Sequence, residues 1–189
     1  MNLECLGWME EARRALGVFD TSQLDPVVRI CAACLGGGGT ILVCGNGGSA
    51  ADSMHLTAEL VGRFLAERRP LRAVCLSDDT AAITAIANDY GYEKVFARQV
   101  EALARPGDLL VAISTSGRSP SIIQAVEAAR AAGAGVVAMT GAGGAEFAAS
   151  ADAAIIAPAS VSGHVQEVLL AAGHALCAAL EAELAGKPR

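Results

Sequence analysis

The chain has 189 residues, 53% of them hydrophobic, and a formal net charge of −6 at pH 7. This composition supplies the core of one globular domain and excludes a disordered chain or a repeat array. The negative charge argues against a general surface for nucleic acid or anionic membrane, because nothing offsets the repulsion from phosphates. Any phosphate ligand must therefore be held locally.

No uncharged apolar run reaches the roughly 18 residues of a membrane span, and acidic and basic residues are mixed in the N-terminal segment MNLECLGWMEEARR. We expect a cytoplasmic protein without a membrane partner. The six cysteines lie in apolar segments at irregular spacings, which is typical of reduced, buried thiols. Cys31 and Cys34 form a C-x-x-C, but neither a second pair nor a strand–turn context supports a zinc or redox site there.

In chain order, the predicted elements begin with two helices and then alternate. Apolar spacing predicts a helix over 2–19, and Asp25 followed by Pro26 predicts a second helix with Asp25 as its N-cap. Strands are predicted at 40–45, 71–77, 108–114, 135–140 and 153–158, helices at 49–65, 79–87, 93–104, 120–132 and 162–185, and a mobile connection at 141–152. This alternation indicates a parallel sheet covered on both faces, with ligands at the carboxyl ends of the strands.

Two polar loops follow predicted strands. The segment CGNGGSAADSMH (44–55) predicts a tight turn into a helix N-terminus, where free N–H groups and the helix dipole favour an anion. The segment STSGRSPS (114–121) adds four hydroxyl donors, Ser114, Thr115, Ser116 and Ser119, which suit the three acceptor oxygens of a phosphate. The alternative for the second loop is an ordinary serine-rich turn with Ser119 or Ser121 as an N-cap.

Two predicted helices carry residues with catalytic chemistry. His55 and Glu59 are four residues apart and share a helix face, where they can bind a metal together or act as acid and base. His174 lies among Leu, Ala, Gly and Cys, a setting typical of a buried core histidine. Gln166 precedes His174 by about 12 Å of straight helix, so both reach one centre only at nearly full extension. Otherwise they serve sites in different copies of the chain.

Four segments in order, ILVCGNGGSAADSMHLTAELVGRF, AITAIANDYGYEKVFARQVEAL, GDLLVAISTSGRSPSIIQAVEAARAAG and VQEVLLAAGHALC, resemble the phosphoheptose isomerases among the SIS (sugar isomerase) domain proteins. The resemblance covers residues 36–182. It implies a three-layer α/β/α sandwich with a five-stranded parallel sheet, in a single domain over 1–189 whose residues 1–37 form a helical extension at an oligomer interface. It also implies a homotetramer, with active sites at subunit interfaces and one zinc ion per site.

The resemblance further implies conversion of sedoheptulose 7-phosphate to D-glycero-D-manno-heptose 7-phosphate through an enediol. Such a reaction needs a base over the carbons and an acid for the oxygens, the roles implied for Glu59 and His174. The implied zinc ligands are His55, Glu59, Gln166 and His174. The implied substrate contacts are Asn46, Gly47, Ser49, Glu59, Arg63, Asn88, Asp89, Ser114, Thr115, Ser116, Ser119 and Gln166.

The chain departs from the family pattern at three places, one of which is Met54 and Thr57 beside His55, interpreted as repacking. Arg118 stands where many relatives have Asn, and it either pairs with phosphate or points to solvent; we favour solvent. Ser162, Gly163 and His164 stand where many relatives carry Asp or Thr and then Arg, which changes a polar contact near the active site or the substrate.

Two other functions compete with an isomerase. One is a non-catalytic SIS regulator or sugar-phosphate binder, as in relatives that bind a replication initiator, but those lack the Glu and His pair that is present here. The other is a dinucleotide-dependent enzyme, because residues 45–50 fit G-x-G-x-x-A. The acid expected about 20 residues later is missing, since Asp78 and Asp79 come too late.

Overall fold

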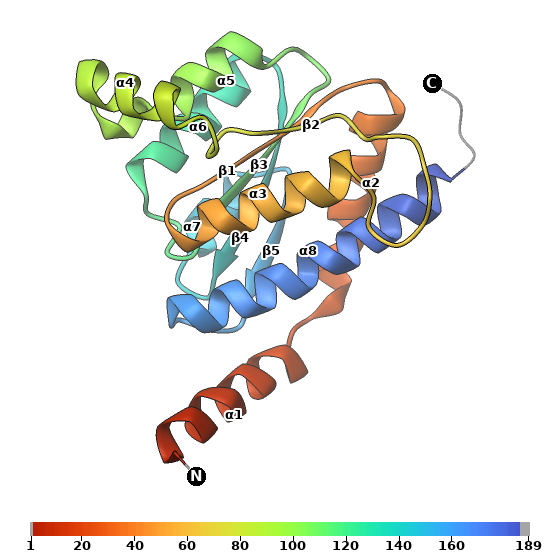
Figure 1. Cartoon of the computed structure of the whole chain (residues 1–189), viewed down its shortest axis with the longest axis vertical. Helices are drawn as coiled ribbons and strands as arrows, with labels where there is room; N and C mark the ends of the chain where they lie inside the picture. The colour runs from red at the N-terminus through yellow and green to blue at the C-terminus, as the bar shows by residue number, and fades with distance from the viewer. Residues whose placement is uncertain (1, 186–189) are drawn as a thin grey trace.

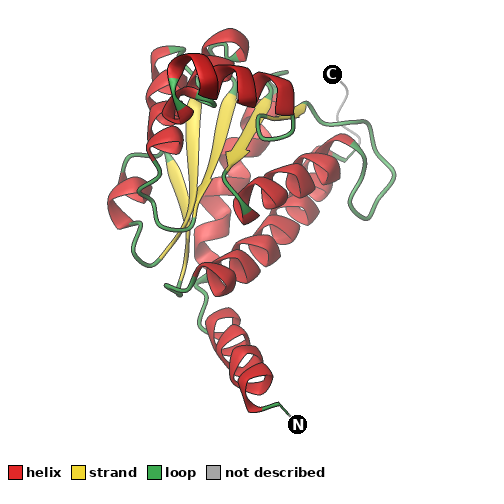
Figure 2. Cartoon of the chain, turned by 60° about the vertical axis from the view of Figure 1, so that its left-hand side comes forward, coloured by secondary structure: helices red, strands yellow, loops and turns green. Residues whose placement is uncertain are grey.

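The computed structural model describes residues 2–185 and has the predicted α/β fold, a five-stranded parallel sheet between two layers of helices (Figures 1 and 2). The strands are β1 (Ile41–Gly45), β2 (Ala73–Cys75), β3 (Leu109–Ser114), β4 (Gly135–Gly141) and β5 (Ala153–Ala157). Their order is β2-β1-β3-β4-β5, with every neighbouring pair parallel. All five strands begin within a few residues of the predicted positions.

The helices are α1 (Leu3–Gly17), α2 (Leu24–Gly36), α3 (Gly48–Val61), α4 (Thr80–Tyr90), α5 (Ala97–Leu103), α6 (Pro120–Ala131), α7 (Ala145–Ala149) and α8 (Ser162–Leu184), with 3₁₀ turns η1 (Thr21–Gln23) and η2 (Tyr92–Lys94). Helices α2, α3 and α8 cover one face of the sheet, and α4, α5, α6 and α7 cover the other. In β3, Val111 and Ile113 enter the first core while Leu110 and Ala112 enter the second. Burial on both faces explains why the strand sequences are continuously apolar.

The strand order places a topological switch between β1 and β3. From β1 the chain crosses to β2 on one side, and it later returns to β3 on the other side. Gly45 pairs in register with Ile113, so the two strands end level with each other. In open α/β sheets ligands bind at such a point, outside the carboxyl ends of the strands. The two polar loops start here.

Four predicted local features differ in the structure. The second helix begins at Leu24, and Asp25 does not cap it; instead Asp20 accepts a hydrogen bond from Ser22 N and caps the 3₁₀ turn η1 before it. Helix α3 ends at Val61, four residues early, where Gly62 ends the helical conformation. The predicted helix 93–104 divides into η2 and α5. The connection 141–152 contains the short helix α7, anchored by the buried side chain of Phe147.

Of the predicted N-terminal extension, only α1 projects from the body of the molecule (Figures 1 and 2). Helix α2 is part of the core, since Val27 and Cys31 are fully buried. Trp8 of α1 packs on α8 and donates a hydrogen bond to Glu167 (2.8 Å). A Cβ at Gly163 would lie 2.6 Å from the Trp8 ring, so this glycine makes room for the tryptophan. That contact gives the family departure at Gly163 a structural reason.

Two expectations from the sequence need correction: that no segment is long and apolar enough to span a membrane, and that all cysteines are buried. By length and composition α8 could cross a membrane, although Glu167 interrupts its apolar run. Half of its apolar window is buried inside this fold, where it packs against α2, α3 and β5. Five cysteines are buried free thiols, as predicted, but Cys5 is exposed on the projecting helix α1.

Candidate active site

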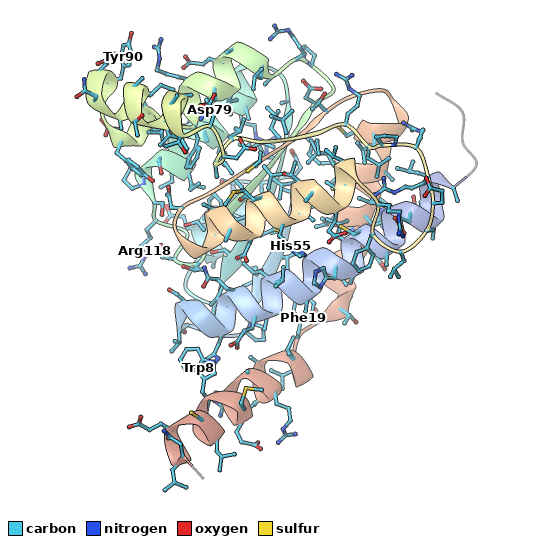
Figure 3. All side chains as sticks on the ribbon, viewed as in Figure 1. Trp8, Phe19, His55, Asp79, Tyr90 and Arg118 are labelled. Carbon is cyan, nitrogen blue, oxygen red and sulfur yellow. The ribbon has the colours of Figure 1, made fainter. Side chains whose placement is uncertain are left out.

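Helices α3 and α8 lie side by side and bring His55 and His174 together (Figures 1 and 3). The two Nε2 atoms are 2.9 Å apart, and the rings meet edge to face with centroids 5.0 Å apart. Glu59 follows His55 by one turn of α3, and its Oε1 lies 3.6 Å from His55 Nε2. Two imidazoles and a carboxylate from distant parts of the sequence therefore converge at one point.

Asp52 belongs to the same group, and the sequence analysis missed it. It lines a small cavity together with His55, Glu59, Gly173 and His174. Its Oδ2 is buried and lacks a hydrogen-bond partner within residues 2–185. Burial raises the pKa of the Asp52 carboxyl, and the nearby His55 offsets part of that rise. The signal was present in the sequence, because Asp52, His55 and Glu59 follow the i, i+3, i+7 spacing of one helix face.

Gln166 does not join this group within one chain. A Cβ added to Gly48 would lie 2.0 Å from Gln166 Nε2, so the Gln166 side chain rests on the first turn of α3. His55 lies about two turns further along that helix. In the described part of the chain, no group of three or more His, Cys, Asp or Glu side chains is arranged to hold a metal. The donors near His174 are of the type zinc prefers, but one chain does not complete the predicted four-ligand set.

The predicted hydroxyls of the loop after β3 are held by local contacts, and Thr115 Oγ1 lies 3.3 Å from Ser162 Oγ at the start of α8. Ser114 Oγ accepts from Gly117 N (3.1 Å) and lies 3.4 Å from Ser119 Oγ, while Ser116 Oγ accepts from Arg118 N (3.2 Å). Gly117 adopts φ +67°, a conformation that disfavours other residues. Ser119 is the N-cap of α6 but makes no side-chain capping bond. The loop therefore presents hydroxyl groups at a helix N-terminus, where an anion is favoured.

The loop after β1 is tied to the loop after β3 through Asn46. Asn46 Nδ2 donates to Ser121 Oγ (2.9 Å), and Asn46 Oδ1 accepts from Tyr92 Oη (2.8 Å). Tyr92 was not among the predicted site residues. A cavity at this edge of the sheet is lined by Asn46, Tyr92, Glu93, Ser119, Pro120 and Ser121. The hydrogen bonds bridge the topological switch and close one side of the crevice.

Gly47 and Ser49 shape the turn into α3. Gly47 has φ +56°, which permits the tight turn. Ser49 is buried, and a Cβ at Gly45 would lie 2.3 Å from its carbonyl oxygen, so the turn needs glycine there. At the end of β2, Ser77 Oγ accepts from Gly45 N (3.1 Å). A hydroxyl thus stands where a dinucleotide-binding fold places its ribose-binding acid, which disfavours that alternative.

Three predicted contacts, Arg63, Asn88 and Asp89, have exposed side chains. Arg63 is exposed beyond the end of α3, with its Nε 4.0 Å from Glu67 Oε2. Asn88 donates to Asp89 (2.7 Å) on the exposed end of α4, which covers the opposite face of the sheet from α3. Arg118 is exposed and points away from the molecule, as predicted (Figure 3). One chain therefore assembles only part of the predicted site.

The comparisons with known proteins identify the family of the chain and agree with its fold. A family model described as SIS domain matches residues 7–141. A phosphoheptose isomerase of Akkermansia muciniphila is 49% identical over 164 residues, 87% of each chain. The structure of a phosphoheptose isomerase from Neisseria gonorrhoeae is 38% identical, with a TM-score of 0.83 over 95% of this chain and 96% of that chain. One from Francisella tularensis is 32% identical, with a TM-score of 0.89 over 96% and 100%.

Proposed function

The chain belongs to the phosphoheptose isomerases, a branch of the SIS domain family, and from that premise we propose how its residues share the isomerisation. It is an aldose–ketose isomerase that converts sedoheptulose 7-phosphate to D-glycero-D-manno-heptose 7-phosphate. The observation that carries the proposal is the convergence of Glu59, His55 and His174 between α3 and α8. The regulator alternative would leave this convergence without a use.

In the proposed reaction Glu59 is the base. Its carboxylate takes a proton from C1 of the ketose, which leaves an enediol, and returns a proton to C2. His174 moves the accompanying proton between the two oxygens, so that the carbonyl passes from C2 to C1 and no atom is gained or lost. His55 Nε2, 2.9 Å from His174 Nε2, orients the His174 ring and influences which ring nitrogen of His174 carries the proton.

The phosphate end of the substrate is assigned to the loop after β3. The Ser114 and Ser119 hydroxyls lie 3.4 Å apart at the N-terminus of α6, and Ser116 and Thr115 of the same loop are proposed to complete the phosphate contacts. Binding energy from the non-reacting phosphate positions the reacting carbons. Asn46, fixed by Ser121 and Tyr92, is placed to hold a sugar hydroxyl at the switch point.

Zinc is proposed as a partner of His55, Glu59 and His174, with Gln166 contributed by a second copy of the chain. The support is the meeting of two imidazole nitrogens, together with the separate position of Gln166 against Gly48. When bound, zinc would stabilise negative charge on the substrate oxygen.

A homotetramer with shared sites is proposed for the same reason, because Gln166, Asn88 and Asp89 lie away from the catalytic pair of their own chain. Helix α1 supports an assembly, since Leu3 (81% exposed) and Met9 (65%) present apolar surface. We place the protein in the cytoplasm, in keeping with its reduced thiols.

The first experiment is to incubate the purified protein, metal-loaded and metal-stripped, with sedoheptulose 7-phosphate and to follow the aldose by NMR. Turnover supports the isomerase, and the difference between preparations measures the contribution of the metal. Thermal protection by the sugar phosphate without turnover would favour the regulator.

A further inference from the structure

The segment after α3, residues 62–70, is held by a buried ion pair that the reaction described above does not use. Glu181 of α8 and Arg68 of this segment are paired at 3.1 Å, and their side chains are 6% and 8% exposed. The Glu181 carboxylate also accepts hydrogen bonds from the backbone N–H groups of Phe64 (2.7 Å), Leu65 (3.0 Å) and Ala66 (2.9 Å). Burying two charges is costly, and here it is offset by a full set of hydrogen bonds.

The ion pair is linked to the proposed catalytic residues in two ways, through the end of α3 and through Phe64. Arg68 donates to the backbone carbonyl of Glu59 (Nη2, 2.7 Å) and to that of Leu60 (Nη1, 2.9 Å) at the end of α3. Phe64 stacks on the His174 ring, with centroids 5.4 Å apart and the planes 19° from parallel. Glu181 follows His174 by seven residues, so both lie on one face of α8.

The His174 ring needs such support. In the described part of the chain only its Nε2 has a hydrogen-bond partner, so no bond to Nδ1 fixes the ring plane. Histidines that work in a site are usually oriented through the second ring nitrogen. Here the Phe64 ring packs on the face of the imidazole and limits its rotation in place of such a bond.

We propose that Phe64, anchored by Glu181 and Arg68, is a positioning residue that holds the His174 imidazole toward His55 and Glu59. The inference rests on the proposed function for its effect on turnover, but the ring geometry can be tested without turnover. A misplacement of about 1 Å in a catalytic group can cost up to about a hundredfold in rate. Loss of the Phe64 ring is therefore expected to lower kcat.

The kinetic test compares Phe64→Leu with Phe64→Tyr and with Phe19→Leu. Phe19 is a matched control, because it is also a partly buried phenylalanine packed on the same core, whereas the ring stacked on His174 is that of Phe64. We expect Phe64→Leu to lower kcat about tenfold with KM within about twofold. Phe64→Tyr keeps the ring and should restore most of kcat, and Phe19→Leu should leave kcat unchanged. Equal kcat in the two leucine variants, or equal losses in the leucine and tyrosine variants, overturns the proposal.

A double-mutant cycle tests whether Glu181 acts through Phe64. Glu181→Gln and Phe64→Leu should each lower kcat, and the double variant should lose no more than the worse single variant. Asp152→Asn is the control, since it weakens the half-exposed ion pair with Arg130 of α6, a helix on the opposite face of the sheet from α8. Additive losses in the double variant contradict action through Phe64.

NMR of histidine-labelled protein separates this inference from the proposed function. The His174 ring is stacked with Phe64, so its ring-proton shifts should include a ring-current contribution that is lost in Phe64→Leu. Unchanged His174 signals overturn the inference whether or not the enzyme turns over. A wild type that fails to turn over while the signals move contradicts the proposed function alone.

Discussion

The contact between α3 and α8 and the exposed end of α4 both carry predicted site residues, but they differ in completeness. Within one chain α3 and α8 place His55, Glu59 and His174 in contact, because both helices pack on the same face of the sheet. Asn88 and Asp89 at the end of α4 face solvent and bond to each other. The difference indicates that helix packing alone brings His55, Glu59 and His174 together, whereas Asn88 and Asp89 lie outside that contact.

The largest expected effect comes from removing the base at the α3–α8 contact. Glu59→Gln keeps the shape of the side chain but cannot accept the C1 proton, so kcat should fall about a thousandfold or more. Thermal protection by sedoheptulose 7-phosphate should persist, because the phosphate loop is untouched. Retained turnover in this variant would show that Glu59 is not the base.

Mixed assemblies test whether the incomplete part of the site comes from another copy. Glu59→Gln and Gln166→Ala should each be nearly inactive alone. After unfolding and joint refolding, random mixing should restore about a quarter of the sites, because Glu59 and Gln166 would then come from different chains. No recovery in a refolded mixture, with the wild type refolded as control, would place both residues in the same chain's site.

Acid should weaken the contact between α3 and α8, because it protonates Glu181. Burial by itself raises the pKa of Glu181, but hydrogen bonds from Ala66, Phe64 and Leu65 and the charge of Arg68 outweigh it and lower the pKa to about 2, from 4.5. The stabilisation is therefore complete above about pH 4.5 and is lost as pH falls toward 2, about 3 kcal/mol in all. Urea unfolding across this range should show a loss in the wild type that is smaller in Glu181→Gln. Parallel pH curves for the two proteins would rule out this role.

A change in the phosphate loop should raise KM more than it lowers kcat. Ser119→Ala removes one hydroxyl donor and should raise KM about tenfold, the effect of one hydrogen bond to a charged group. The measurement is initial rate against sedoheptulose 7-phosphate concentration. A fall in kcat with KM unchanged would move Ser119 from binding to chemistry.

Arg118, the neighbour of Ser119, should have the smallest effect. Its side chain is exposed and points away from the strand ends, so Arg118→Ala should keep kcat and KM within about twofold. A KM rise comparable to that of Ser119→Ala would show that Arg118 turns inward to pair with phosphate.

The sheet could be predicted from the sequence because its strands are buried on both faces and read as apolar runs between glycine-rich turns. The start of α2 could not, because the 3₁₀ turn capped by Asp20 leads directly into the helix before Asp25. For the site, spacing along α8 already indicated that Gln166 and His174 could not readily meet one centre. The structure shows that separation.

Other parts of the site depend on contacts between distant segments and leave little trace in the sequence. Asp52 could have been found from its spacing to His55. The contacts of Phe64 with His174 and of Tyr92 with Asn46 could not, because each depends on how a loop folds back over the sheet. The Glu181–Arg68 pair spans 113 residues, beyond the range of any local pattern.

The central claim is that Glu59 drives proton transfer through an enediol. The most direct measurement is the reaction of sedoheptulose 7-phosphate in D₂O, run to equilibrium and followed by NMR at C2 of the aldose product. If the proton held by Glu59 exchanges with solvent before it is returned to C2, deuterium accumulates at C2 of the wild-type product. Glu59→Gln should incorporate almost no deuterium within the same time. Full conversion by the wild type with no deuterium at C2 would contradict the account, because the hydrogen would then pass directly between the carbons.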